Sequence, residues 1–304
     1  MSLTPIGAPR LKITVSSLRD RKVQHEPITC LTAYDYSSAR LVDEAGMDMI
    51  LVGDSLAMTM LGHENTLSVT VDEMLHHVKA VRRGVRDALL VADMPYGSYH
   101  TDAKDAVRNA MRFVKEGGAE AVKMEGGERR VDVIRQIIDA EIPVAGHIGL
   151  MPQSVNRMGG FKVQGKTLGD IEQLMRDATA LDRAGVACIF LEGIPREVAD
   201  LITNEVSAPT IGIGAGPGCD GQVLVFHDIL NLTFGPAAKF VRRYGDAAAE
   251  ITHAVQAYRA DVMSRQYPAD NESYHLPAET RHALETLLER KRTVRGRRQI
   301  AAVE

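Results

Sequence analysis

The sequence is poor in aromatic residues: it has no tryptophan, and aromatic residues make up only 5% of its 304 residues. It also has no apolar run near the ~20 residues that a membrane-spanning helix needs, which argues against a membrane protein. With a formal net charge of −4, it has no broad basic surface to attract nucleic acid. The first ten residues lack the long apolar core of a secretory signal. We therefore expect a cytoplasmic protein that binds neither membranes nor nucleic acid.

Cysteine is scarce as well. Cys30, Cys188 and Cys219 are widely separated, and two of them fall in or beside apolar runs. Buried, reduced thiols are a better interpretation of these residues than a redox role.

The chain does contain a loose repeat, in which a helix ends at a glycine and an apolar strand begins at once. Gly46, Gly118 and Gly185 each stand at such a junction, and glycine adopts the left-handed conformation that ends a helix at little cost. The intervening segments have helical spacing of apolar residues, and Thr70-Val-Asp-Glu73 predicts a capping box. Strands that alternate with helices indicate βαβ units and a parallel sheet.

Eight apolar runs are predicted to be strands: Ile28–Thr32, Met49–Gly53, Leu89–Ala92, Ala121–Met124, Pro143–Gly146, Ala187–Leu191, Thr210–Ile213 and Gln222–Val225. Eight strands favour a closed (β/α)8 TIM barrel, although an open sheet of eight would have the same local pattern. A helix predicted over residues 15–24 would cap the lower end of the barrel. We expect one catalytic domain over residues 1–266. A C-terminal extension over 267–304 would contain a surface helix and a solvated, partly disordered basic tail from Lys291.

Polar side chains stand at the carboxyl ends of five of these strands, where a (β/α)8 barrel builds its active site. They are Asp54, Asp93, Lys123, Glu125, His147 and Glu192. A single such residue could simply end a strand. Six residues from five strands, four of them carboxylates, indicate a metal site with a base beside it.

Carboxylate oxygens suit a hard divalent cation such as Mg²⁺, which usually takes one or two carboxylates and keeps several waters. Asp54 and Asp93 would be neighbours in a barrel, and Glu125 could reach the same ion directly or through water. The alternative is that each aspartate caps the following helix. The three residues together favour the metal site.

The remaining polar residues suggest the rest of the chemistry. Lys123 shares a strand face with Glu125 and could hold an anionic substrate group, or the two could form a structural ion pair. Glu192 follows Phe190-Leu191. An apolar setting can raise the pKa of a carboxylate towards neutrality, which suits a general base. His147 would lie between the metal site and the base as a donor or proton shuttle, with a structural histidine as the alternative.

Two glycine-containing segments stand out. Gly212-Ile-Gly214-Ala-Gly216 is similar to a barrel phosphate-binding loop, but close chain packing explains it equally well. It lacks the spacing of a dinucleotide fingerprint. Residues 151–166 form a long predicted loop, in which Gly159-Gly160 is a candidate hinge.

Several segments in unbroken order between Ile13 and Tyr244 resemble the signature segments of the ketopantoate hydroxymethyltransferases. They are Leu31-Thr-Ala-Tyr-Asp35, Val52-Gly-Asp-Ser55, Ala92-Asp-Met-Pro-Tyr96, Val122-Lys-Met-Glu-Gly126, Gly146-His-Ile-Gly-Leu150, Val163-Gln-Gly-Lys166, Leu191-Glu-Gly-Ile-Pro195 and the run from Ile211 to Gln222. Members of the family commonly have Cys-Val where this chain has Gly193-Ile194. The segment after Gln266 has no clear counterpart in this resemblance.

The resemblance implies a barrel of the phosphoenolpyruvate/pyruvate type that uses magnesium and 5,10-methylenetetrahydrofolate to make ketopantoate for pantothenate and coenzyme A synthesis. Asp54 and Asp93 would ligate Mg²⁺, with Glu125 completing the site. Ser55 and Lys123 would join them in holding 3-methyl-2-oxobutanoate. The resemblance also implies small-molecule partners only, and a large ring-like homo-oligomer such as a decamer.

The same resemblance makes Glu192 the base that removes the proton next to the ketone, with His147 beside the bound keto acid. One rival hypothesis is a lyase of the same superfamily, but no Lys-Lys-Cys-Gly-His-type loop follows Glu125. A second rival is a non-catalytic keto-acid sensor, which would tolerate loss of Glu192. A partner-binding scaffold is a weaker hypothesis, because it leaves the strand-end residues without a role.

Overall fold

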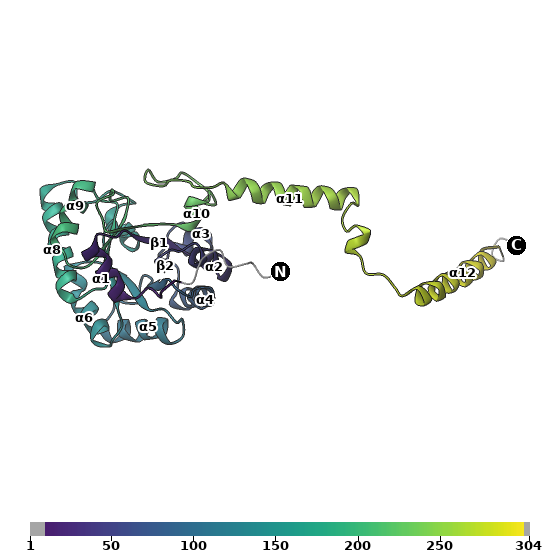
Figure 1. Cartoon of the computed structure of the whole chain (residues 1–304), viewed down its shortest axis with the longest axis horizontal. Helices are drawn as coiled ribbons and strands as arrows, with labels where there is room; N and C mark the ends of the chain where they lie inside the picture. The colour runs from purple at the N-terminus through teal and green to yellow at the C-terminus, as the bar shows by residue number, and fades with distance from the viewer. Residues whose placement is uncertain (1–9, 301–304) are drawn as a thin grey trace. The chain divides into compact units, whose positions relative to one another are not determined.

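The computed structural model describes residues 10–300, and their side chains through Arg292. Eight parallel strands hydrogen-bond in chain order, and the eighth pairs with the first, so that the sheet closes into a barrel (Figure 1). The strands are β1 Ile28–Thr32, β2 Met49–Val52, β3 Leu89–Asp93, β4 Ala121–Glu125, β5 Val144–Gly149, β6 Cys188–Glu192, β7 Thr210–Ile213 and β8 Gly221–Leu224. The predicted (β/α)8 barrel is confirmed, and each predicted strand lies within a few residues of an observed one.

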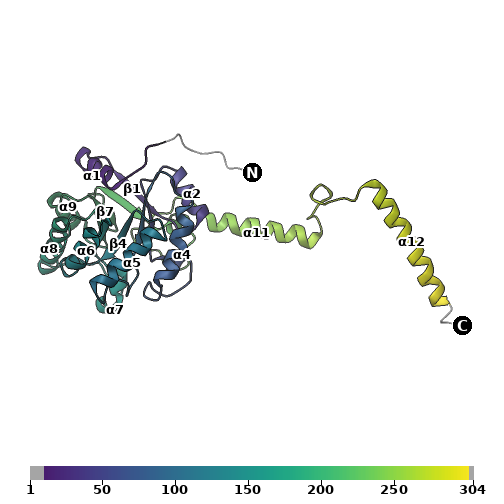
Figure 2. The same ribbon diagram turned by 90° about the horizontal axis from the view of Figure 1, so that it is seen from below.

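Helices connect the strands and surround the barrel, as Figures 1 and 2 show for α4, α5, α6 and α8. Through Asp246 the helical elements are α1 Val15–Gln24, α2 Tyr36–Glu44, α3 Leu56–Thr59, α4 Val71–Arg82, α5 Ala103–Lys115, η1 Glu128–Arg130, α6 Val131–Asp139, η2 Pro152–Ser154, α7 Val155–Met158, α8 Leu168–Ala184, α9 Arg196–Glu205 and α10 Phe226–Ile229. After Asp246 they are α11 Ala247–Ser264, η3 Asp270–Glu272 and α12 Ala278–Ile300. Among the described residues, no helix is both long and apolar enough to cross a membrane.

The local signals in the sequence determine where these helices begin and end. Thr70 and Glu73 form the predicted capping box at the start of α4, so that two backbone N–H groups of the first turn gain side-chain acceptors. Gly46, Gly118 and Gly185 all have positive φ values, of 91°, 73° and 85°. The predicted glycine-ended helices are confirmed.

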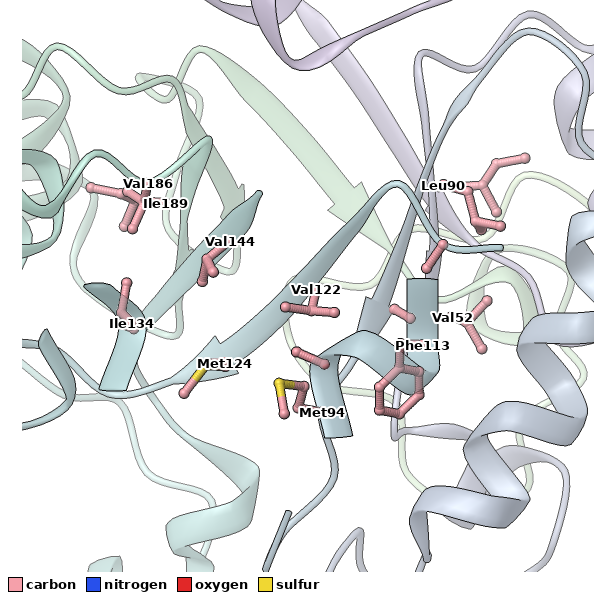
Figure 3. Packing of buried hydrophobic residues seen from close by; sticks show 14 of the residues in the cluster. Val52, Leu90, Met94, Phe113, Val122, Met124, Ile134, Val144, Val186 and Ile189 are labelled. Atoms are coloured by element: carbon pink, nitrogen blue, oxygen red, sulfur yellow. The ribbon is translucent and has the colours of Figure 1, made fainter. Parts of the chain in front are cut away.

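Two apolar clusters hold the barrel together. The outer cluster lies between strands and helices, and Figure 3 shows Val122 and Val144 on neighbouring strands with Phe113 of α5 and Ile134 of α6 in the same packed layer. The inner cluster fills the lower barrel interior. Leu18 of α1 belongs to that inner cluster, so the predicted N-terminal helix does pack against the barrel interior.

The C-terminal region differs in two ways from the sequence prediction. The chain divides into a barrel unit that ends at Asp246 and a C-terminal unit that begins at Ala247. The predicted boundary at residue 266 falls inside the second unit, whose helix α11 contains no buried residue. Helix α12 continues as far as Ile300 through the basic segment from Lys291, for which the sequence predicts a solvated, partly disordered tail.

The long predicted loop also contains some structure. Residues 151–166 include η2 and the short helix α7, and then continue without regular structure to α8. Gly159 and Gly160, the candidate hinge, both have positive φ values.

Candidate active site

The polar strand-end residues point into the upper barrel because of strand alternation. Side chains two positions apart share a face of a strand. Four residues of this set continue the direction of an apolar residue of the inner cluster: Asp93 follows Val91, Lys123 follows Ala121, His147 follows Ala145 and Glu192 follows Phe190. The sequence placed them just past the strands, whereas the structure makes Asp93, Glu125 and Glu192 the last strand residues and puts His147 inside β5.

Asp93 is the point where strands β2, β3 and β4 are joined. Its Oδ1 accepts a hydrogen bond of 2.5 Å from Lys123 Nζ, and both side chains are buried. Its Oδ2 accepts one of 2.9 Å from the backbone N–H of Asp54. Glycine at position 53 leaves room for the Ser55 side chain, because a Cβ there would lie 2.8 Å from Ser55 Oγ. The predicted neighbours Asp54 and Asp93 therefore do lie together.

Gln153, in η2 of the long loop, joins the same site from above and was not found from the sequence. Its Nε2 donates to Asp54 Oδ2 at 2.9 Å and to the Met94 carbonyl at 3.0 Å. Its backbone N–H donates to Glu125 Oε2 at 3.1 Å, and its Oε1 accepts from the Tyr99 hydroxyl at 2.5 Å. Gln153 thus fixes the orientation of two carboxylates. No periodicity marks such a residue, because it lies in an irregular segment.

His147 lies between Glu125 and Glu192, as predicted. Its Nε2 is 3.3 Å from Glu192 Oε2, and its Nδ1 is 3.8 Å from Glu125 Oε1. Neither ring nitrogen forms a hydrogen bond within the described part of the chain, although the ring is buried.

Gly193, which directly follows Glu192, has φ +55°, and a Cβ there would lie 3.0 Å from Leu150 Cβ. Glycine adopts this left-handed conformation without the strain that a Cβ would add.

Ser55 lies at the edge of this group. Its Oγ is 2.8 Å from the hydroxyl of Tyr34, a residue that the sequence analysis did not single out. Burial raises the pKa of Tyr34 to about 12, so the phenol keeps its proton and can donate.

Four carboxylates and one lysine share the site, so negative charge is in excess. Burial and the neighbouring Asp93 raise the pKa of Asp54 to about 7. Burial and then Asp54 raise the pKa of Glu125 well above its usual value. For Lys123, burial lowers the pKa, but Asp93, Asp54 and Glu125 outweigh burial and hold the pKa above its usual value. The site is therefore poised to take up further positive charge.

The donor set fits a magnesium ion held by few protein ligands. Asp54 and Asp93 supply oxygen donors from adjacent strand ends, and the excess negative charge favours a cation. Within the described residues, no group of three or more His, Cys, Asp or Glu side chains converges as a complete metal site. The three predicted ligands are thus not preassembled. Two carboxylates suffice for an ion that completes its shell with water and substrate oxygens.

The glycine-rich loop after β7 shows close packing. A Cβ at Gly214 would lie 2.6 Å from Phe240 Cδ1, and one at Gly216 would lie 2.4 Å from Arg196 Cβ. These distances favour the packing interpretation over a phosphate loop.

Cys30 and Cys188 are buried free thiols, and Cys219 is a half-buried one. Burial raises the pKa of Cys188 to about 12 and of Cys219 to about 11, in agreement with unreactive thiols.

A closed barrel with carboxylates, a lysine and a histidine at the carboxyl ends of its strands defines the class of (β/α)8 barrel enzymes. Among solved structures, the chain is similar to a phosphoenolpyruvate phosphomutase from Streptomyces platensis subsp. rosaceus, with a TM-score of 0.57, 15% identity, and coverage of 92% of this chain and 98% of that one. It is also similar to a 2,3-dimethylmalate lyase, described as a member of the PEP mutase/isocitrate lyase superfamily, with a TM-score of 0.54, 15% identity, and coverage of 95% and 99%. At this identity the likeness concerns the fold.

The family follows from the sequence comparisons. A profile described as ketopantoate hydroxymethyltransferase matches residues 12–270. A 3-methyl-2-oxobutanoate hydroxymethyltransferase from Koribacter versatilis (strain Ellin345) is 71% identical over 289 residues, which are 95% of this chain and 98% of the relative. Another, from Syntrophomonas wolfei subsp. wolfei, is 54% identical and covers 88% of this chain and 97% of its own length. The chain belongs to the ketopantoate hydroxymethyltransferase family and is an enzyme.

This membership sets aside the lyase, sensor and scaffold hypotheses. It also changes the interpretation of the C-terminal extension. The match to the Koribacter relative covers 95% of this chain, and the unmatched remainder is shorter than the segment after Gln266. Part of that segment is therefore included in the match. At least one relative therefore has a counterpart of most of this segment.

Proposed function

We propose that the protein transfers a hydroxymethyl group from 5,10-methylenetetrahydrofolate to 3-methyl-2-oxobutanoate, in a reaction that requires Mg²⁺. The product, ketopantoate, would serve pantothenate and coenzyme A synthesis in the cytoplasm. Two curated relatives with the name 3-methyl-2-oxobutanoate hydroxymethyltransferase support the acceptor and the group transferred. The single observation that carries the chemistry is the placement of Glu192 across the barrel mouth from Asp54 and Asp93, with His147 between them.

Asp54 and Asp93 would hold the magnesium ion, and Glu125 would contact it through water. When bound, the ion supplies Lewis-acid stabilisation of the negative charge that develops on the keto oxygen. Gln153 keeps Asp54 oriented for this task through its hydrogen bond of 2.9 Å.

The keto acid would bind between Lys123 and Ser55. The ammonium group of Lys123 has three N–H donors, and its buried partner Asp93 does not use all of them. One of these donors is used by Asp93, and the others can hold the substrate carboxylate. Ser55 offers a hydroxyl whose position is set by Tyr34.

Glu192 would take the proton from C3 of the keto acid, leaving the C–H electron pair on the enolate. The enolate carbon then forms a bond to the methylene carbon of the donor, whose bonds to the folate nitrogens break. Water supplies the new hydroxyl group, and the folate nitrogens regain protons. His147 Nε2, at 3.3 Å from Glu192, can hold or pass the proton that Glu192 takes.

The test is the exchange of deuterium at C3 of 3-methyl-2-oxobutanoate, followed by NMR. Exchange should occur with Mg²⁺ and should stop in EDTA, and ketopantoate should form only when the folate donor is added. Exchange that continues unchanged in EDTA would remove magnesium from the proposal. Absence of exchange under every condition would overturn the proton-transfer step. The ring-like homo-oligomer stays a prediction, which sedimentation of the purified protein tests.

A further inference from the structure

A second cavity adjoins the catalytic cluster on the side of the long loop. It has a volume of about 600 Å³ and shares Glu125 with the cluster. Its walls come from the turn after β4, the segment after β5 and helix α8. This volume falls within the ~300–1,000 Å³ that is typical of small-molecule sites. A keto acid of five carbons does not need this space, so the cavity is available to a second, larger molecule.

Asp177 of α8 is the best-placed polar group in the cavity. Its Oδ1 accepts hydrogen bonds from the Glu128 backbone N–H at 2.9 Å and from Gln173 Nε2 at 3.1 Å. Its Oδ2 accepts none within the described part of the chain, although the side chain is half-buried. Gly127 makes this arrangement possible, because a Cβ there would lie 2.2 Å from the Asp177 side chain. The carboxylate is thus held in one orientation with one oxygen free.

The other lining residues include both apolar and cationic side chains. Ile148, Met158 and Leu174 supply apolar surface. Arg129 and Arg157 also line the cavity, and neither guanidinium has a hydrogen-bond or ion-pair partner in the described part of the chain. Two such cations beside an apolar slot suit a ligand with a flat apolar body and an anionic end.

We propose that this cavity binds the one-carbon donor, with the free Oδ2 of Asp177 accepting a hydrogen bond from an N–H group of a planar heterocycle and with Arg129 and Arg157 binding an anionic tail. The inference rests on the proposed function, since that reaction needs a donor next to the enolate carbon. A reduced folate has this chemistry: its ring carries an amino group next to a ring N–H, and its glutamate tail carries carboxylates. Glu125 marks the end of the cavity where the methylene group meets the keto acid.

The first test compares Asp177→Asn with Glu172→Gln, an exposed carboxylate on the same helix outside the cavity. Asparagine keeps an oxygen for the Glu128 and Gln173 donors but loses the charge and presents N–H groups to the ligand. The KM for the folate donor should rise about tenfold or more in Asp177→Asn, since hydrogen bonds to a charged group are strong. Donor-free C3 exchange measures the keto-acid site separately. A KM within twofold of wild type would overturn the role of Asp177.

The second test concerns the anionic tail. Tetrahydrofolate and 6-methyltetrahydropterin, which lacks the whole aminobenzoylglutamate tail, are titrated into wild type, into the Arg129→Gln/Arg157→Gln double variant and into Arg135→Gln, an exposed control on α6. The double variant should lose affinity for tetrahydrofolate by about tenfold and keep that for 6-methyltetrahydropterin, because only the former carries carboxylates. An affinity for tetrahydrofolate that is the same in all three proteins would overturn the tail site.

These tests separate the two proposals. Direct binding of tetrahydrofolate to wild type, with loss in Asp177→Asn, supports the cavity even if C3 exchange fails. Formation of ketopantoate with no change in donor KM or binding in either variant would keep the proposed function and overturn this inference.

Discussion

The lower and upper halves of the barrel interior are built from the same strands in the same alternation, yet they have opposite chemistry. The lower half contains Met49, Val91 and Phe190, which are all buried in the inner apolar cluster. Two residues further along their strands, Val91 and Phe190 are followed by Asp93 and Glu192. A step of two residues keeps the direction of the side chain and moves it about 6–7 Å towards the mouth.

The difference separates stability from activity. Apolar burial in the lower half stabilises the fold, at roughly 25 cal/mol per Å² removed from water. The buried charges of the upper half gain little net stability, because their desolvation offsets their mutual attraction. Placing several carboxylates together in a buried site disfavours their ionised forms. The pKa of Asp54 shows this, because burial and Asp93 raise it to about 7. We therefore expect substitutions in the two halves to have different effects.

The largest effect is expected at Glu192 of the upper half. Glu192→Gln should lower C3 exchange by about a hundredfold or more, as is typical when a general base is removed. Binding of magnesium and keto acid should persist, because those contacts come from Asp54, Asp93 and Lys123. The measurement is NMR exchange together with calorimetry, and Glu197→Gln, an exposed glutamate on α9, is the matched control.

Exchange at the wild-type rate in Glu192→Gln would show that another group is the base. His147 would then be the next candidate, because its Nε2 lies 3.3 Å from the Glu192 carboxylate.

Met49 of the lower half should show the opposite pattern. Met49→Ala removes a fully buried side chain and should lower the free energy of unfolding by about 2–5 kcal/mol. Keto-acid affinity, measured at urea concentrations well below the unfolding transition, should change little. Met49 is the first residue of β2 and so lies at the end of that strand opposite the mouth. Urea denaturation followed by circular dichroism gives the first quantity and calorimetry the second. A large loss of affinity without loss of stability would contradict the division into halves.

Local patterns in the sequence predicted the strands and the polar residues at their carboxyl ends. Apolar runs of four or five residues between helical segments indicated eight strands, and alternation gave Lys123 and Glu125 a common face. Gln153 could not be predicted in this way. Its four hydrogen bonds depend on how an irregular loop folds back over the barrel, and no periodic pattern encodes that path. Asp177 was missed for a different reason, since on its regular helix it looks like any surface aspartate.

Lys123 tests whether the upper half binds substrate or only balances charge. Lys123→Met keeps most of the side-chain volume and removes the cation, so affinity for 3-methyl-2-oxobutanoate should fall at least about tenfold. Affinity for the neutral amide of the same acid should change less, because it has no carboxylate for Nζ to bind. Lys115→Met, at the exposed end of α5, is the control for calorimetry. Equal losses for acid and amide would make Lys123 a structural partner of Asp93 only.

The smallest effect is expected outside both halves, at the capping box of α4. Thr70→Ala removes the hydroxyl that accepts from the Glu73 N–H at 3.2 Å and donates to the Glu73 carboxylate at 2.8 Å. The free energy of unfolding should fall by about 1 kcal/mol at neutral pH. C3 exchange should be unchanged, since α4 contributes no residue to the site. Urea denaturation of both proteins across a range of pH checks the first expectation.

The pH dependence sharpens this last comparison. Hydrogen bonds from Thr70 lower the pKa of Glu73 from its ordinary 4.5, so the ionised carboxylate is the form that the capping box stabilises. A group whose pKa is lowered on folding contributes stability above its unfolded pKa and loses that contribution as the pH falls through the folded value. The difference in unfolding free energy between wild type and Thr70→Ala should therefore be constant above pH ~5 and should shrink below pH ~4. A difference that stays constant down to pH ~3 would assign the effect to the Glu73 N–H bond alone.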